Sequence, residues 1–462
     1  MSSVARVFGA VDIGASGGRV VAGVVDGDRT TLHVVHRFPN GVVTLDGHLR
    51  WDFTRLYREV LTGLRALARR FPDVVSIGID TWAVDYGLLA EDGTVLAEPV
   101  AYRDGRTADA VARVHRRTSP EALYAVNGLQ HLPFTTLYQL EAERSSPLWD
   151  KAAHVVLLPD LLAYRLTGEL RTEITNASTT GLLDVRTRTW AAELAPDVPF
   201  PPLQEPGEVR GPLLPEVLAA TGLPATTVVT SVGSHDTASA VVALPADGPR
   251  FAYVSSGTWS LAGVELPGPV LTDRARELNF TNEGGVDGRT RFLRNVGGLW
   301  LLQESLREWG VDDPAELLAR AEALPPGGPT VDVDDPAFLA PGDMPRRIAA
   351  AATGPLRTPA ETVRCVLDSL AVAYARTVDQ AVGLTGHDVD VIHIVGGGSR
   401  NDLLCRLTAS LSGRRVTAGP VEATALGNVL VQARAHGAAP DTLEAIRARL
   451  AAAEDVRHYL PE

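Results

Sequence analysis

Two segments of this chain share one pattern: an apolar strand, a short turn of glycine and hydroxyl residues, and a second apolar strand. The first occupies residues 7–25 with the turn Gly14-Ala-Ser-Gly-Gly18, and the second occupies residues 251–264 with the turn Ser255-Ser-Gly-Thr258. Apolar runs separated by such turns predict β-hairpins. A hairpin repeated in both halves predicts two related domains that face each other across a ligand-binding cleft.

The rest of the chain alternates strands with helices, which is typical of an α/β fold. The expected elements are a strand at 32–38, a helix at 52–70 with Asp52 as its N-cap, a strand at 74–79, a helix at 361–382, a strand at 389–395 and a helix at 403–411. The last strand and helix are joined by a glycine turn around Gly397. Strand, glycine turn and helix in that order predict an anion- or nucleotide-binding corner.

The length of 462 residues, 45% of them apolar, indicates two domains with cores of their own. A proline- and glycine-containing segment at 244–250 is typical of a domain boundary. We therefore predict an N-terminal domain over residues 1–245, which carries the sugar site and the first phosphate turn. A C-terminal domain over 246–462 would bind the nucleotide.

The basic residues are almost all arginines, since Lys151 is the one lysine in the chain. A Walker-type phosphate loop and a protein kinase both need a lysine at the nucleotide phosphates, and Lys151 stands in neither context. Pyridoxal phosphate chemistry would also depend on Lys151, whose neighbour Asp150 favours the charged, unreactive amine. The net charge of −13 makes nucleic acid an unfavourable partner.

Cys365 and Cys405 are the two cysteines, which leaves no disulfide framework and no Cys-x-x-Cys motif. The N-terminus lacks the pattern of a secretory signal, and no run approaches the length of a membrane span. The histidines show no zinc-binding spacing. We therefore expect a cytoplasmic protein with no membrane partner.

The first turn has the groups that a nucleotide phosphate tail needs. Its glycines let the backbone approach phosphate oxygens, Ser16 supplies a hydroxyl donor, and Asp12 at the strand end is suited to hold Mg²⁺, directly or through water. An ordinary hairpin, in which Asp12 and Ser16 bind turn amides, explains the same residues equally well. The second turn adds amides and hydroxyls, and together the two turns favour ATP as a ligand.

Two further clusters are candidates for binding the other substrate. Asp236, at the start of a helical run, is either an N-cap or a general base that takes a proton from a substrate hydroxyl. The segment Asp80-Thr-Trp-Ala-Val-Asp85 follows an apolar strand, where α/β sheets place ligand contacts. In one interpretation Trp82 stacks on a sugar and Asp80 or Asp85 binds sugar hydroxyls. In the other, Asp80 and Thr81 form a local turn and Trp82 fills the core.

These motifs resemble the FGGY carbohydrate kinases of the actin-like ATPase superfamily, over most of the chain from Val11 to about Gly427. The segments that carry the resemblance are Asp12-Ile-Gly-Ala-Ser-Gly-Gly-Arg19, Gly78-Ile-Asp-Thr-Trp-Ala-Val-Asp85, Leu132-Pro-Phe-Thr-Thr-Leu-Tyr-Gln139, Ser234-His-Asp-Thr-Ala-Ser-Ala240, Ser255-Ser-Gly-Thr-Trp-Ser260, Thr281-Asn-Glu-Gly-Gly285, Asn295-Val-Gly-Gly-Leu-Trp-Leu-Leu-Gln303 and Ala418-Gly-Pro-Val-Glu-Ala423.

The resemblance implies two ribonuclease-H-like domains, the cofactors ATP and Mg²⁺, and phosphorylation of the ketose L-rhamnulose on its terminal hydroxyl in rhamnose catabolism. It implies that Asp236 is the catalytic base and that Ala83, His235 and Thr237 line the sugar site with it. Asp12 would hold the metal. The ATP contacts would be Ala15, Ser16, Gly17, Gly18, Arg19, Thr258, Asn295, Gln303 and Gly397.

Three positions depart from the family pattern. Ala83 stands where the pattern has glycine, and His131 and Thr135 stand where it has phenylalanine and asparagine. An added methyl group at position 83 would narrow the sugar pocket. The sequence thus leaves open a related ketose, such as L-fuculose or L-xylulose, and a noncatalytic actin-like sugar or nucleotide sensor, against which Asp236 argues. It leaves the oligomeric state undetermined.

Overall fold

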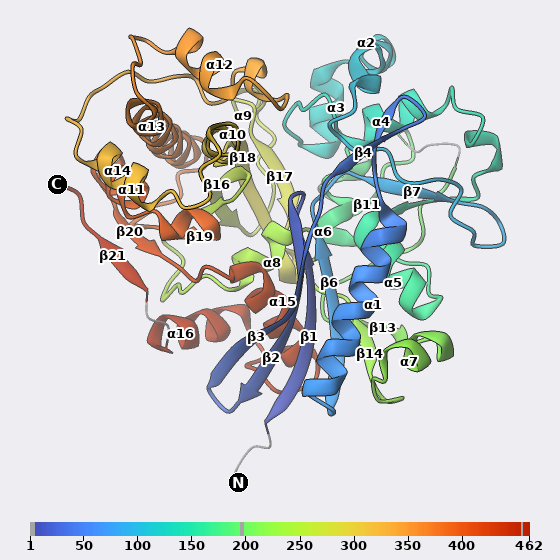
Figure 1. The fold of residues 1–462 in the computed structure, drawn as a ribbon. Helices are drawn as coiled ribbons and strands as arrows, with labels where there is room; N and C mark the ends of the chain where they lie inside the picture. Colours follow the sequence, from blue (N-terminus) through green and yellow to red (C-terminus); the bar gives the residue numbers. More distant parts are fainter. Residues whose placement is uncertain (1–4, 195–197, 454–455) are drawn as a thin grey trace. The chain divides into compact units, whose positions relative to one another are not determined.

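The computed structural model describes residues 5–194, 198–453 and 456–462, which form two compact units (Figure 1). Unit 1 comprises Met1–Ala243, Leu266–Arg291 and Ala423–Ala453, and unit 2 comprises Leu244–Glu265, Phe292–Glu422 and Glu454–Glu462. Strands and helices alternate in both units, so the predicted α/β class is confirmed. The domain boundary placed at residue 245 stays a prediction.

The sheet of unit 1 is built around the first predicted hairpin. Its strand order is β13 (Val209–Pro212), β14 (Val228–Thr230), β6 (Val74–Thr81), β1 (Arg6–Ile13), β2 (Gly17–Asp26) and β3 (Arg29–Pro39). β1 and β2 pair antiparallel, whereas β1 and β14 both pair parallel with β6. The carboxyl ends of these three parallel strands therefore meet at one edge of the sheet, where ligand contacts are expected.

Helices α1 (Phe53–Arg70) and α15 (Ala423–Ala435) cover the two faces of this sheet (Figure 1). α1 begins as predicted, because the Asp52 side chain accepts a hydrogen bond of 2.9 Å from the Arg55 amide. Residues alternate between faces along a strand, so Val11 and Ile13 of β1 pack with α1, while Phe8 and Ala10 pack with α15.

Gly427 of α15 stands against α8 (Asp236–Val242) at close range. A Cβ atom at this position would lie 1.8 Å from the backbone oxygen of Ser239. Only glycine permits this approach, because a backbone atom cannot turn aside as the tip of a side chain can. The close contact fixes α8, which begins with Asp236, against the helix that covers the sheet.

Unit 2 contains the second predicted hairpin. Its strands lie in the order β18 (Thr290–Gly297), β16 (Trp259–Leu266), β15 (Phe251–Ser256), β19 (Val391–Val395), β20 (Arg415–Ala418) and β21 (Arg457–Tyr459). β15 and β16 pair antiparallel, and β15, β19 and β20 run parallel. The predicted long helix is α13 (Pro359–Thr385), which starts with a capping box between Thr358 and Glu361.

The remaining elements complete each unit. In unit 1 they are β4 (Val42–Leu45), β5 (His48–Trp51), β7 (Tyr86–Leu89), α2 (Ala108–Arg117), α3 (Pro120–Asn127), α4 (Thr136–Glu143), β8 (His154–Leu157), α5 (Leu158–Thr167), β9 (Thr172–Glu173), α6 (Ile174–Ala177), β10 (Leu183–Asp184), β11 (Thr189–Trp190), β12 (Leu203–Gln204), α7 (Pro215–Thr221), α9 (Asp273–Glu277), β17 (Thr281–Gly284) and α16 (Leu443–Ala453). In unit 2 they are α10 (Trp300–Trp309), α11 (Ala315–Glu322), α12 (Met344–Ala351) and α14 (Asp402–Ser412).

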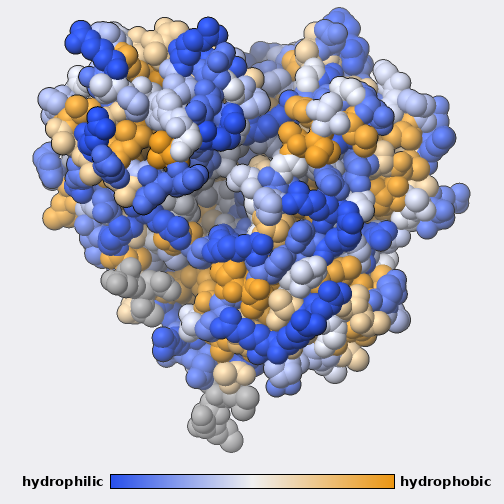
Figure 2. All heavy atoms as spheres, in the orientation of Figure 1, coloured by the Kyte–Doolittle hydropathy of each residue, from blue (hydrophilic) through white to orange (hydrophobic). Residues whose placement is uncertain are grey.

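On the face shown in Figure 2, hydrophilic residues predominate and hydrophobic residues form scattered patches. Within the part of the chain that the structure describes, none of the helices combines the length and apolar character needed to cross a bilayer.

Candidate active site

Three aspartates lie near one another at the edge of the unit 1 sheet. Asp12 and Asp80 are register partners on the neighbouring strands β1 and β6, so their side chains lie on the same face. Asp80 is fully buried and accepts a 2.6 Å hydrogen bond from Asn428 Nδ2, while its Oδ1 has no hydrogen-bond partner among the described residues. Burial, and next the Asp12 and Asp236 carboxylates, raise the pKa of Asp80 well above its ordinary value.

Arg19 neutralises Asp12, since its Nε and Nη2 donate to Asp12 Oδ2 at 2.9 and 2.6 Å. Both residues line a cavity of about 450 Å³ at the β1–β2 turn. The other lining residues are Gly14, Ser16, Gly17, Gly18, Arg37, Phe38 and Pro39. The predicted first phosphate segment thus lines one cavity with two arginines, except for Ala15, which packs against the core. Backbone amides, a hydroxyl and guanidinium groups suit an anion.

Asp236 does not cap α8, although its place in the sequence suggested that it could. The N-cap of α8 is His235, which makes no side-chain cap bond, and Asp236 is the first residue of the helix. Its carboxylate is 33% exposed, and Oδ1 accepts from the Thr237 hydroxyl at 3.1 Å. The carboxylate is therefore available to a ligand at a helix N-terminus, where negative charge is stabilised.

The segment before α8 is anchored to the end of β6 and to a buried glutamate. The Thr81 amide donates to the Ser234 carbonyl at 2.9 Å. Glu173 Oε2 accepts from the amide and the hydroxyl of Ser234, at 3.0 and 2.7 Å, and from the Thr175 hydroxyl at 2.6 Å. These bonds, with a parallel bridge between Thr81 and His235, hold the start of α8 at the end of β6, two residues before Ala83.

Ala83 begins a tight turn in which the next residue, Val84, has a strained backbone conformation. The Asp85 amide donates to the Ala83 carbonyl at 3.0 Å, and Val84 between them has φ of 67°. A γ-turn with positive φ at a β-branched residue costs about 1–3 kcal/mol. The Thr136 hydroxyl and Gln139 Nε2 hold the turn by donating to the Val84 carbonyl, at 2.7 and 3.3 Å. Ala83 itself is half-buried.

Both carboxylate oxygens of Asp85 accept hydrogen bonds from protein groups, so Asp85 is not available to bind a sugar. Oδ2 accepts from Trp51 Nε1 at 2.6 Å, Trp82 Nε1 at 2.9 Å and the Tyr102 amide at 3.2 Å, and Oδ1 accepts from Gln139 Nε2 at 3.0 Å. The Trp51 and Trp82 rings lie 4.3 Å apart in the core. Trp82 therefore fills the core, as one of the two interpretations expected, whereas Asp80 and Thr81 belong to strand β6 and form no turn. Asp85 binds the donors around the turn at Ala83.

The same carboxylate predicts a pH effect on stability. Desolvation raises the pKa of Asp85 to about 6, although the four donors oppose the shift. Because the folded-state pKa exceeds the unfolded value of about 3.9, the stability that Asp85 contributes is complete below pH 4 and is lost as the pH rises through 6. Relative to Asp85→Asn, the wild type should lose about 1 kcal/mol per pH unit between pH 4.5 and 6. Urea unfolding followed by tryptophan fluorescence measures the free energy of unfolding of both proteins. A wild type that gains stability relative to Asp85→Asn as the pH rises would contradict the prediction.

In unit 2 the structure brings Thr258 and the glycine corner together. Thr258 lies in the β15–β16 turn, which is closed by a 2.9 Å bond from the Gly257 amide to the Trp259 carbonyl. The corner around Gly397 packs against the end of β15, since a Cβ atom at Gly398 would lie 2.1 Å from Ser256 Oγ. The predicted anion-binding corner after β19 thus adjoins the second hydroxyl turn.

Asn295 and Gln303 flank a segment, between β18 and α10, that is hydrogen-bonded to the same turn. The Leu299 amide donates to the Gly257 carbonyl at 2.9 Å, and the Trp300 amide donates to the Thr258 carbonyl at 3.2 Å. Asn295 lies at the end of β18 and Gln303 is exposed on the first turn of α10. All four predicted nucleotide residues of unit 2 therefore lie on segments around one turn.

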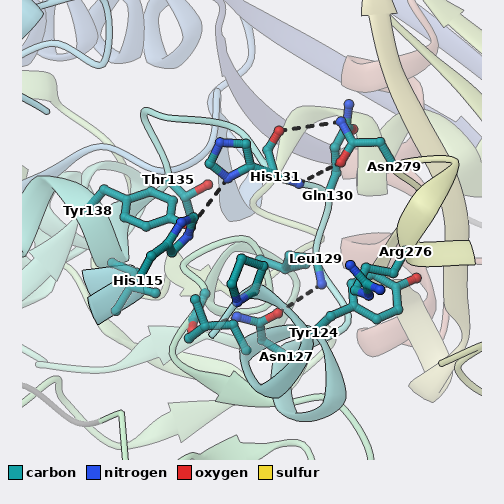
Figure 3. A pocket seen from close by; sticks show the side chains of 14 residues that line it. His115, Tyr124, Asn127, Leu129, Gln130, His131, Thr135, Tyr138, Arg276 and Asn279 are labelled. Carbon is teal, nitrogen blue, oxygen red and sulfur yellow. Dashed lines mark hydrogen bonds between the residues drawn. The ribbon is translucent and has the colours of Figure 1, made fainter. Parts of the chain in front are cut away.

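His131 and Thr135, two of the departures from the family pattern, line a separate cavity of about 130 Å³ in unit 1 (Figure 3). The Tyr138 hydroxyl lies 3.4 Å from His131 Nδ1 and 2.9 Å from His115 Nε2. Desolvation and His115 lower the pKa of His131 below its ordinary value. Thr135 uses its hydroxyl locally, donating to the Leu132 carbonyl at 2.9 Å.

Glu283 and Arg291 contact the site, although the sequence assigned them no role. Arg291 Nη2 lies 3.0 Å from His235 Nδ1 and 3.1 Å from Glu283 Oε2. The sequence held little signal for this contact, since β18 carries a second arginine, Arg294, and only the structure shows that Arg291 is the fully buried one. Among the described residues, no group of three or more His, Cys, Asp or Glu side chains is arranged to hold a metal ion.

The chain matches both domains of one enzyme family. Residues 7–243 match the FGGY family of carbohydrate kinases, N-terminal domain, and residues 252–436 match the C-terminal domain of the same family. A rhamnulokinase of Bacteroides thetaiotaomicron is 42% identical over 448 residues, which cover 94% of this chain and 92% of that protein. A rhamnulokinase of Bacillus subtilis is 40% identical over 449 residues, which cover 95% of this chain and 92% of that protein.

Solved structures share the fold at lower identity. The ligand-bound xylulose kinase of Lactobacillus acidophilus superimposes with a TM-score of 0.83 at 17% identity, covering 99% of this chain and 94% of that one. The glycerol kinase of Plasmodium falciparum with ADP gives a TM-score of 0.78 at 16% identity, covering 99% of this chain and 95% of that one. These likenesses establish the two-domain sugar kinase fold.

Proposed function

Because this chain belongs to the FGGY family of carbohydrate kinases, we propose that it transfers the γ-phosphoryl group of ATP to the terminal hydroxyl of L-rhamnulose, giving L-rhamnulose 1-phosphate. The observation that carries this proposal is the partly exposed Asp236 carboxylate at the start of α8, which does not cap the helix, in a chain at least 40% identical to two rhamnulokinases. A cytoplasmic location is part of the proposal, since ATP is the donor.

The proposed reaction needs placement and charge neutralisation more than covalent chemistry, since phosphoryl transfer passes through a loose transition state. Asp236 would accept the proton of the sugar hydroxyl as the bond to phosphorus forms. Ser16, the backbone amides of the first turn and Arg19 would hold the phosphate tail in unit 1. Thr258, Asn295, Gln303 and Gly397 would hold the nucleotide in unit 2.

Asp12 is the proposed holder of Mg²⁺. Asp12 and Asp80 offer only carboxylate oxygens, the hard ligands that this ion prefers. One of these oxygens, Asp80 Oδ1, has no hydrogen-bond partner among the described residues and so fits a role as a ligand. The bound ion supplies positive charge that neutralises the phosphate oxygens. Arg19, which already binds Asp12 Oδ2, would orient that carboxylate.

Ala83 favours a second candidate, a kinase for a related ketose. We expect kcat/KM for L-rhamnulose to exceed the values for L-fuculose and L-xylulose by about 10-fold or more in an ADP-coupled assay. The Ala83→Gly variant should reduce this preference a few-fold and leave KM for ATP unchanged, because only the sugar pocket gains space. Equal rates for the three ketoses would refute the substrate assignment, and no turnover of any ketose would favour the sensor.

A further inference from the structure

The imidazole of His235 is held on one edge by a buried ion pair. Arg291 has no exposed side-chain surface, and its Nε donates to the Gly284 carbonyl at 2.9 Å, which fixes the guanidinium. From there Nη2 reaches His235 Nδ1 at 3.0 Å. Glu283 Oε2 lies 3.1 Å from the same Nη2 and compensates the buried charge.

This contact determines where the ring carries its proton. Glu283 Oε2 also lies 3.3 Å from Nδ1, but the hydrogen-bond geometry at Nδ1 is with Arg291 Nη2 at 3.0 Å and not with this oxygen. A guanidinium has donors and no acceptor, so Nδ1 must accept in that bond. A neutral imidazole that accepts at Nδ1 is protonated at Nε2. Arg291 therefore selects the Nε2–H tautomer of His235.

The opposite edge of the ring faces the catalytic carboxylate. His235 Nε2 lies 3.5 Å from Asp236 Oδ1, and only 7% of the His235 side chain is exposed. The separation exceeds that of a normal hydrogen bond, so the N–H remains available to a third oxygen placed near the two groups. A sugar hydroxyl bound at Asp236 is such an oxygen.

We propose that Arg291 and Glu283 are positioning residues that lock His235 as an Nε2–H donor beside Asp236. The inference rests on the proposed function for the sugar, but the tautomer itself does not depend on it. In this tautomer neither ring nitrogen has a free lone pair, since Nε2 is protonated and Nδ1 is occupied. His235 then binds a sugar oxygen only as a donor, and Asp236 is left as the acceptor for the proton of the reacting hydroxyl.

The direct test is the protonation state of His235 in the free, full-length protein. The protein labelled with ¹⁵N-histidine is examined by long-range ¹H–¹⁵N correlation near pH 7.5, and the His235 signals are identified by their loss in His235→Gln. We expect an unprotonated Nδ1 and a protonated Nε2. Protonation at Nδ1, alone or together with Nε2, would overturn the proposal whether or not the protein proves to be a sugar kinase.

A second measurement tests whether Arg291 selects this tautomer of His235. The double variant Glu283→Gln/Arg291→Met removes both charges together, which a buried pair tolerates better than the loss of one partner. We expect its His235 to show a mixture of the two tautomers. An unchanged Nε2–H signature in the folded double variant would show that Arg291 does not select the tautomer, and the wild-type spectrum still decides the proposal if this variant does not fold.

The third measurement separates the two edges of the ring by kinetics. Gln places an N–H near the position of Nε2, whereas Asn places one near Nδ1. We expect kcat/KM for L-rhamnulose to fall less than about 10-fold in His235→Gln and about 10²-fold in His235→Asn, because only Asn loses the donor beside Asp236. The exposed His458→Gln is the matched control and should equal the wild type. A greater loss in Gln than in Asn would contradict the proposed donor.

Discussion

The Asp236→Asn variant should lose between about 10² and 10⁴ of kcat, since general base catalysis contributes that range. Asn keeps the size and polarity of the side chain but cannot accept a proton. The helix should remain intact, because Asp236 does not cap α8 and it accepts its hydrogen bond from the hydroxyl of its own neighbour, Thr237. An ADP-coupled assay with saturating L-rhamnulose and ATP measures the loss.

Two controls make this result specific. The dissociation constant of L-rhamnulose, measured by calorimetry, should change less than about 10-fold in Asp236→Asn, because the amide still binds hydroxyls. The exposed Asp247→Asn has the same change of charge and should retain full activity. Turnover of Asp236→Asn within a few-fold of the wild type would show that this carboxylate is not the base.

The Gly427→Ala variant should be strongly destabilised, by about 3 kcal/mol or more, because the new methyl group overlaps a backbone atom that cannot move without its helix. The ideal Cβ position lies 1.8 Å from the Ser239 carbonyl oxygen and 2.6 Å from its carbonyl carbon. Relief requires α15 and α8 to separate, and α8 carries Asp236. We therefore expect loss of kcat in whatever fraction remains folded, together with a fall in Tm of several degrees.

Gly383→Ala is the matched control, because Gly383 also lies within a helix, α13, and a Cβ atom there would meet nothing within 4 Å. That variant should be neutral or more stable by about 0.5–1 kcal/mol, since alanine is the better helix former. Calorimetric scans of both variants measure the difference. A Tm for Gly427→Ala that equals the Tm for Gly383→Ala would mean that the two helices are not in close contact.

The residues that the resemblance assigns to the first phosphate segment line one cavity, apart from Ala15, because they are neighbours in a short motif. Their contacts with ATP, and that of Thr258, stay predictions. The departures at His131 and Thr135 prove to line a cavity of their own. The sequence left Asp85 and Trp82 undecided between core and sugar site. Their partners Trp51, Tyr102 and Gln139 are remote in sequence, so no local pattern shows that the carboxylate is already filled.

The sequence by itself determined the α/β class, both hairpins and the helix that begins after Asp52. These features depend on turn residues, caps and apolar spacing within a few residues of one another. Only the tertiary structure decided the left-handed Val84 and the partners of His235. Their causes are hydrogen bonds from distant segments, which hold Val84 in a conformation that its own propensity disfavours and bring Arg291 to Nδ1 of the ring.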